Sequence, residues 1–576
     1  MSTRRETLPM RQAVGLELAK MRRLRAVPIL VAVTAATTAL SASTLFSSSA
    51  RAQWADPASD LWASLLLSCA MMAGALTGPL TAAIMAGHLT DIEHSGSGWN
   101  LAAGVGLTPG RLLRAKVAAL ALLVVPAILV QNLLLVGLGT AVLAAPVPVG
   151  AWVGWTVSLV VLQMIMIAGH AWLSAIVPNQ LVSMTVGLLG GFVGVYMLLA
   201  PPWLARLVLP WGYYAVMSPA GIVDGQTVLV RPGWILLGLL AAAAALLFAT
   251  ATARLDRIEE RGIVLGTALG AGRVLRCRGR AGRTAVQGAR LGPEGAGRTG
   301  AEAGPGSAAR PDSRPERAVA GAGARPRRVR GPVLVGVELS KLRRSAVPVV
   351  AVVVPLLTVV AGAVNYRGNQ GVLSAGWDAL ASQVSVFYSL IFAPLAVALL
   401  VAATWRVEHR GTSWDMMRTT PHSTCAVVLA KAAAVIVPVI AMELVLVAMT
   451  WVAGTALGLG WSMPPALLAQ GLVFILAALP LIGLQSLLSM RMRSFAASVA
   501  ACLGQVVVAF MLVSTLNPAS ALWPVALITR ALTLGSTAMS TAGGLDVAGV
   551  APVLTGSLAS GIACWGALAL AARRRG

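Results

Sequence analysis

Charged residues are scarce in this sequence: they make up 11% of its 576 residues, whereas hydrophobic residues make up 57%. A soluble globular chain carries about 25% charged residues. So small a polar fraction cannot coat the surface of a water-exposed fold, which excludes an ordinary soluble domain. A helix crosses a bilayer core with about 20 consecutive apolar residues, and many segments here reach that length. We therefore expect an all-α polytopic membrane protein.

Motifs for catalysis and metal binding are also lacking. A phosphate-binding P-loop requires a Gly-Lys pair, and no lysine here follows a glycine. No Ser/His/Asp arrangement has a supporting context, and the five cysteines are scattered without a CxxC pair, which argues against a disulfide framework or a zinc site. The sequence therefore predicts no enzyme activity, no metal and no cofactor. The five cysteines are Cys69, Cys277, Cys425, Cys502 and Cys564.

The formal net charge of +24 comes from basic residues that lie between the apolar segments. Because cytoplasmic loops of membrane proteins collect Lys and Arg, this charge does not predict a nucleic-acid partner. Basic residues gather in the N-terminal segment, after the second apolar span of each half and at the C-terminal end, and the alternate loops hold few. We therefore expect a multi-pass protein of the cell (plasma) membrane with both termini in the cytoplasm.

Six spans are expected in each half, or about 12 transmembrane helices in all. Those of the first half are expected at residues 27–46, 61–86, 115–144, 151–177, 181–200 and 233–253. Those of the second half are expected at residues 346–364, 382–404, 426–459, 466–488, 495–516 and 547–571. The third span of each half contains a proline, Pro126 or Pro438, where a kink or tilt is expected.

The two halves are copies of one unit. The sequence GLELAKMRR at residues 15–23 recurs as GVELSKLRR at residues 336–344. A basic segment followed by an apolar run also resembles a signal peptide, but this arrangement occurs in both copies, so we expect the first run to remain as a helix. Six is an even number of spans, so both halves enter the membrane from the same side. They are therefore expected to be parallel 6-helix repeats.

Three regions follow from these patterns. The first six-span half is expected at residues 1–257 and the second at 332–576, with interfacial "elbow" helices at 9–25 and 332–345. The linker at 258–331 is rich in Arg, Gly, Ala and Pro and has few large apolar residues. Such a segment cannot bury a core, so we expect a disordered cytoplasmic linker. It is interpreted as a tether, although a basic segment can also lie on anionic lipid headgroups.

Each elbow helix is expected to be amphipathic and to lie in the membrane interface with its basic side chains near phosphates. Its polar face carries the same three residue types in both copies. These are Glu17, Lys20 and Arg23 in the first copy, and Glu338, Lys341 and Arg344 in the second. The chain has only four lysines, and Lys116 and Lys431 are the other two. The lysines thus form two repeat-related pairs, which indicates either a shared role or simple descent from the duplicated unit.

The segment after the second span repeats the pattern Glu-His-x-Gly-x-x-Trp. Its residues are Glu93, His94, Gly96 and Trp99 in the first copy, and Glu408, His409, Gly411 and Trp414 in the second. Glycine permits a break in a helix, and tryptophan suits the boundary between water and lipid. A repeated Glu-His pair could indicate a metal site, but no further His or Cys lies near either pair, so a role at a helix end or an interface is favoured. A short helix could follow, ending before Thr108-Pro109.

These elements resemble the permease family of the type-2 ABC exporters, in particular the branch associated with lantibiotic and bacitracin self-protection. The resemblance rests on the elbow pattern E-L-x-K-x-R, the six spans and the Glu-His-x-x-x-x-Trp segment. It covers both halves but not the linker. It implies that the Glu-His segments are coupling loops that dock on a separately encoded ABC ATPase, in two copies. It also implies outward movement of a peptide antibiotic, a drug or a lipid-like substrate. Family members are commonly one half-unit, whereas this chain fuses two.

Polar residues within the expected spans are few. Glu443 is the carboxylate, and its repeat mate is Gln131. An ionisable residue inside a membrane is a functional hypothesis by default, and His170 and Gln505 are weaker candidates. Two alternative functions remain open. One is a 6+6 secondary transporter, which needs titratable or ion-binding groups within the spans. The other is a membrane partner of a sensor system that does not transport.

Overall fold

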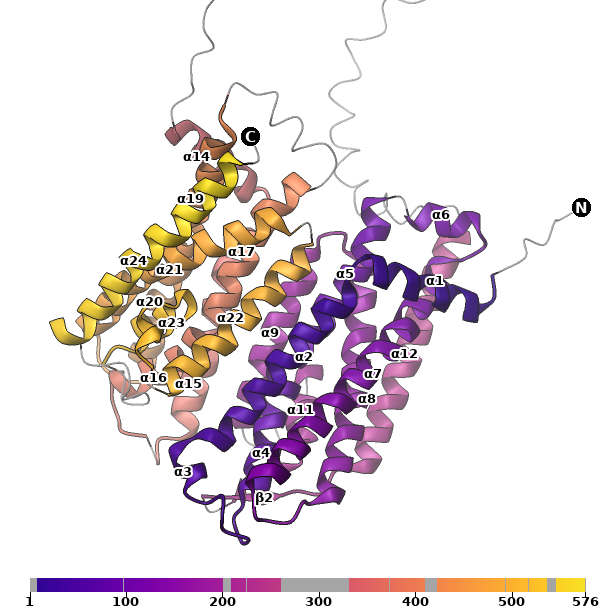
Figure 1. The fold of residues 1–576 in the computed structure, drawn as a ribbon, viewed down its shortest axis with the longest axis horizontal. Coiled ribbons are helices and arrows are strands. Elements are labelled where there is room, and N and C mark those ends of the chain that lie inside the picture. Colours follow the sequence, from indigo (N-terminus) through magenta and orange to yellow (C-terminus); the bar gives the residue numbers. More distant parts are fainter. Residues whose placement is uncertain are drawn as a thin grey trace, which may run out of the picture. The chain divides into compact units, whose positions relative to one another are not determined.

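The computed structural model describes residues 8–96, 98–199, 209–223, 225–260, 331–371, 373–409, 422–492, 494–515, 517–535 and 545–574. This part of the chain is almost entirely helical and has one two-stranded hairpin (Figure 1). Within it, 12 helices are long and apolar enough to cross a membrane, six in each half. A helix satisfies all its backbone hydrogen bonds internally, which is what a bilayer requires. The expected all-α polytopic fold with two repeats is confirmed.

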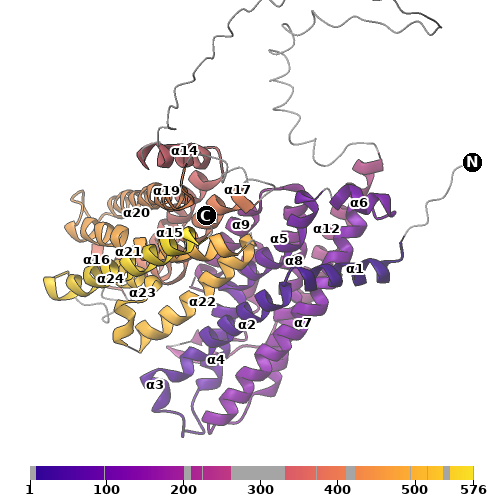
Figure 2. The same ribbon diagram turned by 45° about the horizontal axis from the view of Figure 1, so that its top comes forward.

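The first half begins with the elbow helix α1 (Met10–Arg23), which lies crosswise to the long helices (Figures 1 and 2). Its elements then follow in this order: α2 (Ala26–Ala42), η1 (Ser43–Phe46), α3 (Ser48–Arg51), α4 (Leu61–Cys69), η2 (Ala70–Leu76), α5 (Gly78–Ser95), α6 (Gly98–Gly104), α7 (Pro109–Val142), α8 (Val149–Ile176), α9 (Gln180–Leu199), η3 (Pro210–Gly212), α11 (Tyr213–Val216), β1 (Ala220–Val223), β2 (Gln226–Leu229) and α12 (Trp234–Glu260). Strands β1 and β2 pair in antiparallel fashion.

The second half repeats the order of the elbow helix and the six spans. Its elements are the elbow helix α14 (Gly331–Arg343), α15 (Val347–Gly368), α16 (Trp377–Phe387), η4 (Tyr388–Phe392), α17 (Ala393–His409), α19 (Thr424–Ala434), α20 (Ile436–Ala456), α21 (Pro465–Arg491), α22 (Phe495–Ser514), η5 (Pro518–Ala521), α23 (Pro524–Thr533) and α24 (Val547–Arg573). Between its last two spans it has η5 and α23 where the first half has η3, α11 and the hairpin. The sequence predicted a disordered linker and assigned sites to Gly411 and Trp414. Most of that linker and both of these residues lie outside the described part of the chain.

The second span of each half contains a π-helical turn. In the first half η2 joins α4 to α5, and in the second η4 joins α16 to α17. These two spans are also the most buried of the six in their respective halves. π-Helical turns are rare and frequently occur at functional sites. Their presence in both copies makes the interrupted, buried second span a property of the repeat unit.

The prolines in the third spans act differently in the two copies. Helix α7 continues unbroken through Pro126. In the second half, however, α19 ends at Ala434 and α20 begins at Ile436, two residues before Pro438. Proline cannot donate the backbone hydrogen bond to the carbonyl four residues earlier, and the carbonyl of Ala434 stands at that position. A kink or tilt was expected at both prolines, and a break in the helix occurs only beside Pro438.

The second spans run further than the sequence predicted. They were expected to end at residues 86 and 404, but α5 continues to Ser95 and α17 to His409. The Glu-His pairs therefore lie on the last turns of these helices rather than in loops. The physical reason is that both glutamates are paired with buried lysines, which stabilise the additional turns. The short helix α6 follows α5 and ends before Thr108-Pro109, as expected.

The two halves pack through reciprocal contacts. Helix α2 of the first half packs against α22 of the second, and their repeat equivalents α15 and α9 also pack against each other. In the same way α5 contacts α22, and α17 contacts α9. Both views show α2 beside α22 (Figures 1 and 2). Such reciprocity is the mark of an isologous interface between two like units, here within one chain.

Candidate functional site

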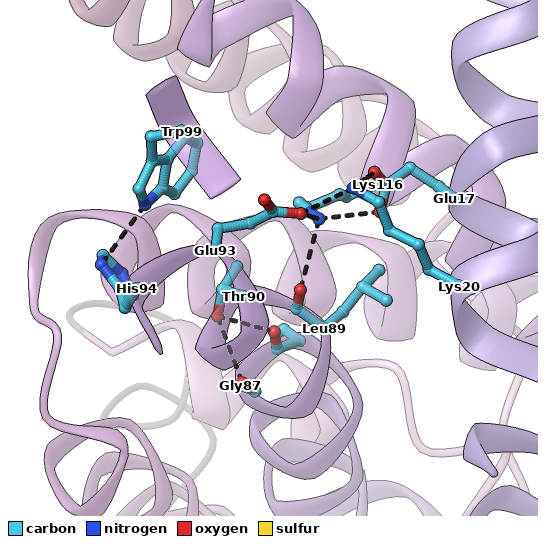
Figure 3. Close-up of polar contacts among 10 residues, drawn as sticks. Glu17, Lys20, Gly87, Leu89, Thr90, Glu93, His94, Trp99 and Lys116 are labelled. Atoms are coloured by element: carbon cyan, nitrogen blue, oxygen red, sulfur yellow. Dashed lines mark hydrogen bonds and ion pairs between the residues drawn. The ribbon is translucent and has the colours of Figure 1, made fainter. Parts of the chain in front are cut away.

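A buried ion-pair cluster joins three elements of the first half. On α7, Lys116 places its Nζ atom 2.7 Å from Glu17 Oε2 of α1 and 2.7 Å from Glu93 Oε1 of α5 (Figure 3). The same ammonium donates to the carbonyl oxygen of Leu89 at 3.2 Å, so all three of its N–H groups have acceptors. Lys116 and both glutamates are buried. The elbow helix, the end of the second span and the start of the third are thereby tied together.

Lys20 completes this cluster from the solvent side. Its Nζ atom lies 2.6 Å from Glu17 Oε1 and 2.8 Å from Glu93 Oε1, and its side chain is 35% exposed. Burial alone would lower the pKa of Lys20, but the hydrogen bonds and charges of the two glutamates outweigh burial and raise the pKa above its ordinary value of 10.5. A raised lysine pKa stabilises the folded state at lower pH, and this contribution is lost only as the pH rises through the raised pKa. Lys20 therefore keeps its positive charge at neutral pH.

The second half contains the same cluster. Lys431 Nζ of α19 lies 2.6 Å from Glu338 Oε2 of α14 and 3.0 Å from Glu408 Oε1 of α17. Lys341 Nζ lies 2.7 Å from Glu338 and 3.3 Å from Glu408. The four lysines of the chain are thus all used in these two clusters. Their pairing across the repeat, which the sequence left open, has a shared structural role.

The elbow glutamates differ in position from the sequence expectation. Glu17 and Glu338 were assigned to a polar face at the membrane interface, but both are buried beneath their helices. Because a buried lysine faces each of them, the carboxylate is turned toward the protein. Arg23 and Arg344 remain exposed, as the amphipathic pattern implied.

The histidine of each Glu-His pair holds the end of the second span against the fourth. His94 Nε2 lies 2.8 Å from the carbonyl oxygen of Ser174 on α8, and His409 Nε2 lies 2.8 Å from that of Ser489 on α21. In the first half Trp99 Nε1 also donates to His94 Nδ1 at 3.3 Å. The accepting Nδ1 must be unprotonated, so Nε2 carries the hydrogen and donates it to Ser174. Both ring nitrogens of this neutral histidine therefore position α5, α6 and α8.

Helix α6 has one face packed on the protein and one face exposed. The ring of Trp99 lies 5.6 Å from that of His94 and packs against a small apolar cluster. That cluster consists of Ala13, Ala102, Leu107, Leu112 and Ala115. Leu101 of α6 is 70% exposed, and Val105, which directly follows the helix, is 55% exposed. The sequence did not single out these two, because an apolar residue near a membrane span carries no signal that separates a partner-facing position from a lipid-facing one.

Glycine is required where α6 begins. A Cβ atom on Gly98 would lie 1.9 Å from Glu93 Oε2, so no larger residue fits without displacing the buried glutamate. Gly96 forms the end of α5, where its N–H donates to the carbonyl oxygen of Ile92 at 3.1 Å. The close approach at Gly98 places the start of α6 directly against Glu93 of the ion-pair cluster.

The family model described as "ABC-2 family transporter protein" matches residues 13–194 and 334–512, which together make up more than half of the chain. The chain belongs to the ABC-2 transporter family. Each matched region contains one ion-pair cluster and one Glu-His pair, so the family unit occurs twice. The protein is therefore the multi-pass membrane permease of an ABC transporter, a family that associates with ABC ATPases. Among curated proteins, none matches the chain.

In this permease the two halves meet beside the Glu-His pairs. Asp91 and Arg406, each two residues before its Glu-His pair, form an ion pair across the interface. Arg406 also donates to Asn179 Oδ1 at 3.2 Å and to the carbonyl oxygen of Pro178 at 3.3 Å. The interface between the halves is thus attached directly to the ends of the second spans.

The intramembrane polar residues of the permease have unequal partners. Gln131 Oε1 accepts a hydrogen bond from Thr37 Oγ1 of α2 at 3.0 Å. Glu443 on α20 is buried, and its Oε2 atom has no hydrogen-bond partner within the described part of the chain. His170 and Gln505, the weaker candidates for intramembrane functional residues, also have polar partners. His170 Nδ1 lies 3.2 Å from Ser183 Oγ, and Gln505 donates to Gln485 Oε1 at 3.4 Å. Within the described residues Glu443 is therefore a buried carboxylate with one uncompensated oxygen, and Gln131 Nε2 and Gln505 Oε1 also lack partners.

Proposed function

We propose that this permease supplies both membrane halves of an ABC exporter and that a separately encoded ATPase docks beside the end of the second span of each half. The observation that supports this most is the presence of the two repeat-related ion-pair clusters. In each half the cluster fastens the glutamate of the Glu-His pair to the elbow helix and to the third span. Two equivalent attachment points predict two ATPase subunits per chain.

The docking surface in the first half is the outer face of α6. Leu101 is exposed there, Val105 is exposed just after the helix ends, and Trp99 packs on the protein side of α6. Interface energy concentrates in a few well-supported residues with tryptophan among the enriched types. Glu93 and His94 are turned into the protein, so they act by positioning α6. In the second half Glu408 and His409 take the same places, and Gly411 and Trp414 are the corresponding docking residues.

The clusters provide a route for mechanical coupling. Removing one partner of a buried ion pair costs about 3–5 kcal/mol, so a force applied at α6 moves the linked elements together before the cluster separates. Those elements include the second span, which is the most buried span of its half and which contacts the other half. Closure of the ATPase subunits around ATP would in this way rock the two halves against each other.

Substrate and direction follow from the resemblance noted for the sequence. The lantibiotic and bacitracin self-protection branch suggests outward transport of a peptide antibiotic, a drug or a lipid-like molecule, and hence a role in antibiotic resistance. The distribution of Lys and Arg favours the cell membrane with both termini in the cytoplasm. In this orientation α6 faces the compartment that contains ATP.

A second candidate is a 6+6 secondary transporter, and Glu443 is the observation in its favour. Its buried Oε2 atom lacks a partner within the described residues, as a proton-binding or cation-binding carboxylate could. Against this candidate stands the repeat mate Gln131, which cannot titrate. An ion-coupled mechanism would therefore use one half of the chain only.

The decisive experiment is co-purification of the full chain with a separately encoded candidate ATPase, followed by ATP turnover in nanodiscs. We expect a complex of one permease chain with two ATPase subunits and turnover that candidate peptides stimulate. The ATPase alone and a hydrolysis-deficient ATPase are the controls. Transport that proceeds without any ATPase and follows an ion gradient would refute the proposal in favour of the secondary transporter.

A further inference from the structure

A groove of about 990 Å³ lies between the two halves at the α1 end of the helices. One side comes from the α1–α2 junction, α5 and the first residue of α9. The other side comes from the end of α21 and the first turns of α22. The groove is separate from the ion-pair clusters and from the exposed face of α6, so neither of the roles above accounts for it.

The rim of the groove is basic. We use "rim arginines" for Arg23 and Arg25 at the α1–α2 junction and Arg491 at the end of α21. None of the three forms an ion pair with a carboxylate within the described part of the chain, whereas Asp91, which also lines the groove, is paired with Arg406. Arg25 adopts a left-handed backbone conformation with φ of 56°, which is costly for a non-glycine residue and occurs preferentially at functional sites. Among the described lining residues, the three rim arginines thus outnumber the one carboxylate, Asp91, which is already paired with Arg406.

An unpaired amide lies in the same groove. Gln180, the first residue of α9, is 4% exposed. Neither its Oε1 nor its Nε2 atom has a hydrogen-bond partner within the described residues. Burying an amide without partners is unfavourable, so Gln180 adds an uncompensated polar side chain to the lining of the groove.

Below the rim the groove becomes apolar. Its wall is formed by residues at helical spacing on two facing helices. They are Pro28, Ile29 and Ala32 on α2, and Ala497, Ala500 and Ala501 on α22. Both helices belong to membrane spans. A ligand that fills the groove therefore combines an anionic, hydrogen-bonding head with an apolar chain.

We infer that the groove binds one anionic phospholipid, with the phosphodiester among the rim arginines and an acyl chain along the apolar wall. Guanidinium groups suit phosphate oxygens because they donate several hydrogen bonds in a fixed plane. Basic pockets between membrane helices on the cytoplasmic side bind anionic headgroups. A soluble phosphate would leave the apolar wall unused. The lipid would contact both halves at once and so join them at the interface.

The equivalent position on the other side of the interface lacks two of the rim arginines, so we expect one such lipid site per chain. The first half reads Arg23-Leu24-Arg25-Ala26 where the second reads Arg344-Ser345-Ala346, so Arg25 has no counterpart. The repeat mate of Arg491 is Ile176. Two of the rim arginines are therefore missing from the equivalent place on the other side of the interface.

The test is native mass spectrometry of the purified full chain, titrated with phosphatidylglycerol and, separately, with phosphatidylcholine. We expect one tightly retained phosphatidylglycerol and no comparable retention of phosphatidylcholine. The double variant Arg25→Gln/Arg491→Gln should weaken phosphatidylglycerol binding roughly tenfold or more, because each arginine near an anionic headgroup contributes substantially. The matched control is Arg343→Gln/Arg344→Gln, which removes the same charge from the other elbow and should bind like the wild type.

Two further measurements separate the alternatives. The variant Ala501→Phe fills the apolar wall without changing charge and should also reduce lipid retention, while an unchanged melting temperature shows that it folds. Millimolar inorganic phosphate should not displace the lipid. Equal losses in the two double variants, no preference for phosphatidylglycerol, or full retention in Ala501→Phe would overturn the inference. Displacement by inorganic phosphate would do the same, because it would identify a soluble anion as the ligand. None of these readouts depends on the proposed ATPase.

Discussion

Asp91 is ion-paired with Arg406, which stands 315 positions later in the chain. The same offset relates Glu93-His94 to Glu408-His409, so the two paired residues occupy equivalent places in the two repeats. Equivalent residues touch only beside the axis that relates the copies. In a dimer of identical half-units both positions would hold the same residue, and like charges would repel. Fusion of two diverged copies permits an acid on one side and a base on the other.

The first prediction concerns this pair. Asp91→Ala should destabilise the permease by about 2 kcal/mol, as expected for a hydrogen bond to a charged group. Arg406→Ala should cost more, because Arg406 also donates to Asn179 and Pro178. Melting temperatures of the purified chain measure both effects. The exchanged variant Asp91→Arg/Arg406→Asp should recover part of the loss, and equal melting temperatures for all variants would show that the pair contributes nothing.

The second prediction concerns the buried lysines. Lys116→Met leaves the two buried glutamates with Lys20 alone and should destabilise the first half by about 3–5 kcal/mol. Lys431→Met should act similarly in the second half. The matched comparison is Lys20→Met, which should cost only about 1 kcal/mol or less because this lysine is 35% exposed. Thermal unfolding monitors each variant.

A rescue variant tests the cause of that loss. Adding Glu93→Gln to Lys116→Met removes one of the uncompensated charges and should restore part of the melting temperature. If Lys116→Met unfolds at the wild-type temperature, the cluster does not hold these elements together, and the proposed coupling route loses its support.

The third prediction concerns ATPase docking. Leu101→Ser removes an exposed apolar contact of α6 and should weaken association of the ATPase with no loss of stability. Trp99→Ala should weaken association by roughly 2 kcal/mol if the tryptophan is a hot spot, but its packing makes some destabilisation expected as well. Trp414→Ala is the counterpart in the second half, where we expect the larger effect because the sequence there is richer in arginine. Pull-down of the ATPase measures association.

A control for docking lies at the opposite end of the second span. Ile222 in β1 is 69% exposed, which matches the 70% of Leu101. Ile222→Ser should therefore leave ATPase association unchanged. Normal association and transport in the double variant Trp99→Ala/Trp414→Ala would identify these segments as ordinary connectors.

The fourth prediction separates the two transport mechanisms. Glu443→Gln should fold at least as well as the wild type, because an amide is cheaper to bury than an unpaired carboxylate. Transport driven by ATP should persist, since the repeat mate at this position is Gln131. Transport assays in proteoliposomes, with and without a proton gradient, provide the measurement. Loss of transport in a stably folded Glu443→Gln variant would favour the secondary transporter.

The fifth prediction concerns orientation. In a chain whose native cysteines are replaced, Leu101→Cys and Gly300→Cys should react with an impermeant thiol reagent only from the cytoplasmic side. Ile222→Cys should react only from the outside, because β1 and α6 lie at opposite ends of the second span. Labelling of Leu101→Cys in intact cells would reverse the proposed topology.

The amino-acid sequence by itself determined the number of spans and the duplication of one six-span unit. These properties depend on local hydrophobicity and on self-similarity, and both can be read without knowing which helices are neighbours. The pairing of the four lysines across the repeat was also visible in the sequence. The structural role of these lysines was not visible, because the periodicity along one helix does not reveal which charged residues of other helices lie beside it.

Only the tertiary structure decided where the polar groups point. Glu17 was expected on the polar face of an interfacial helix, yet it is buried and paired with Lys116 of another helix. The end of α5 was expected to be a loop, yet the buried Glu93 keeps it helical. Asp91 and Arg406 are unremarkable in sequence and become a pair only where the repeats meet. In each case the deciding energy is the cost of burying a charge without a partner, and the partner comes from a distant part of the chain.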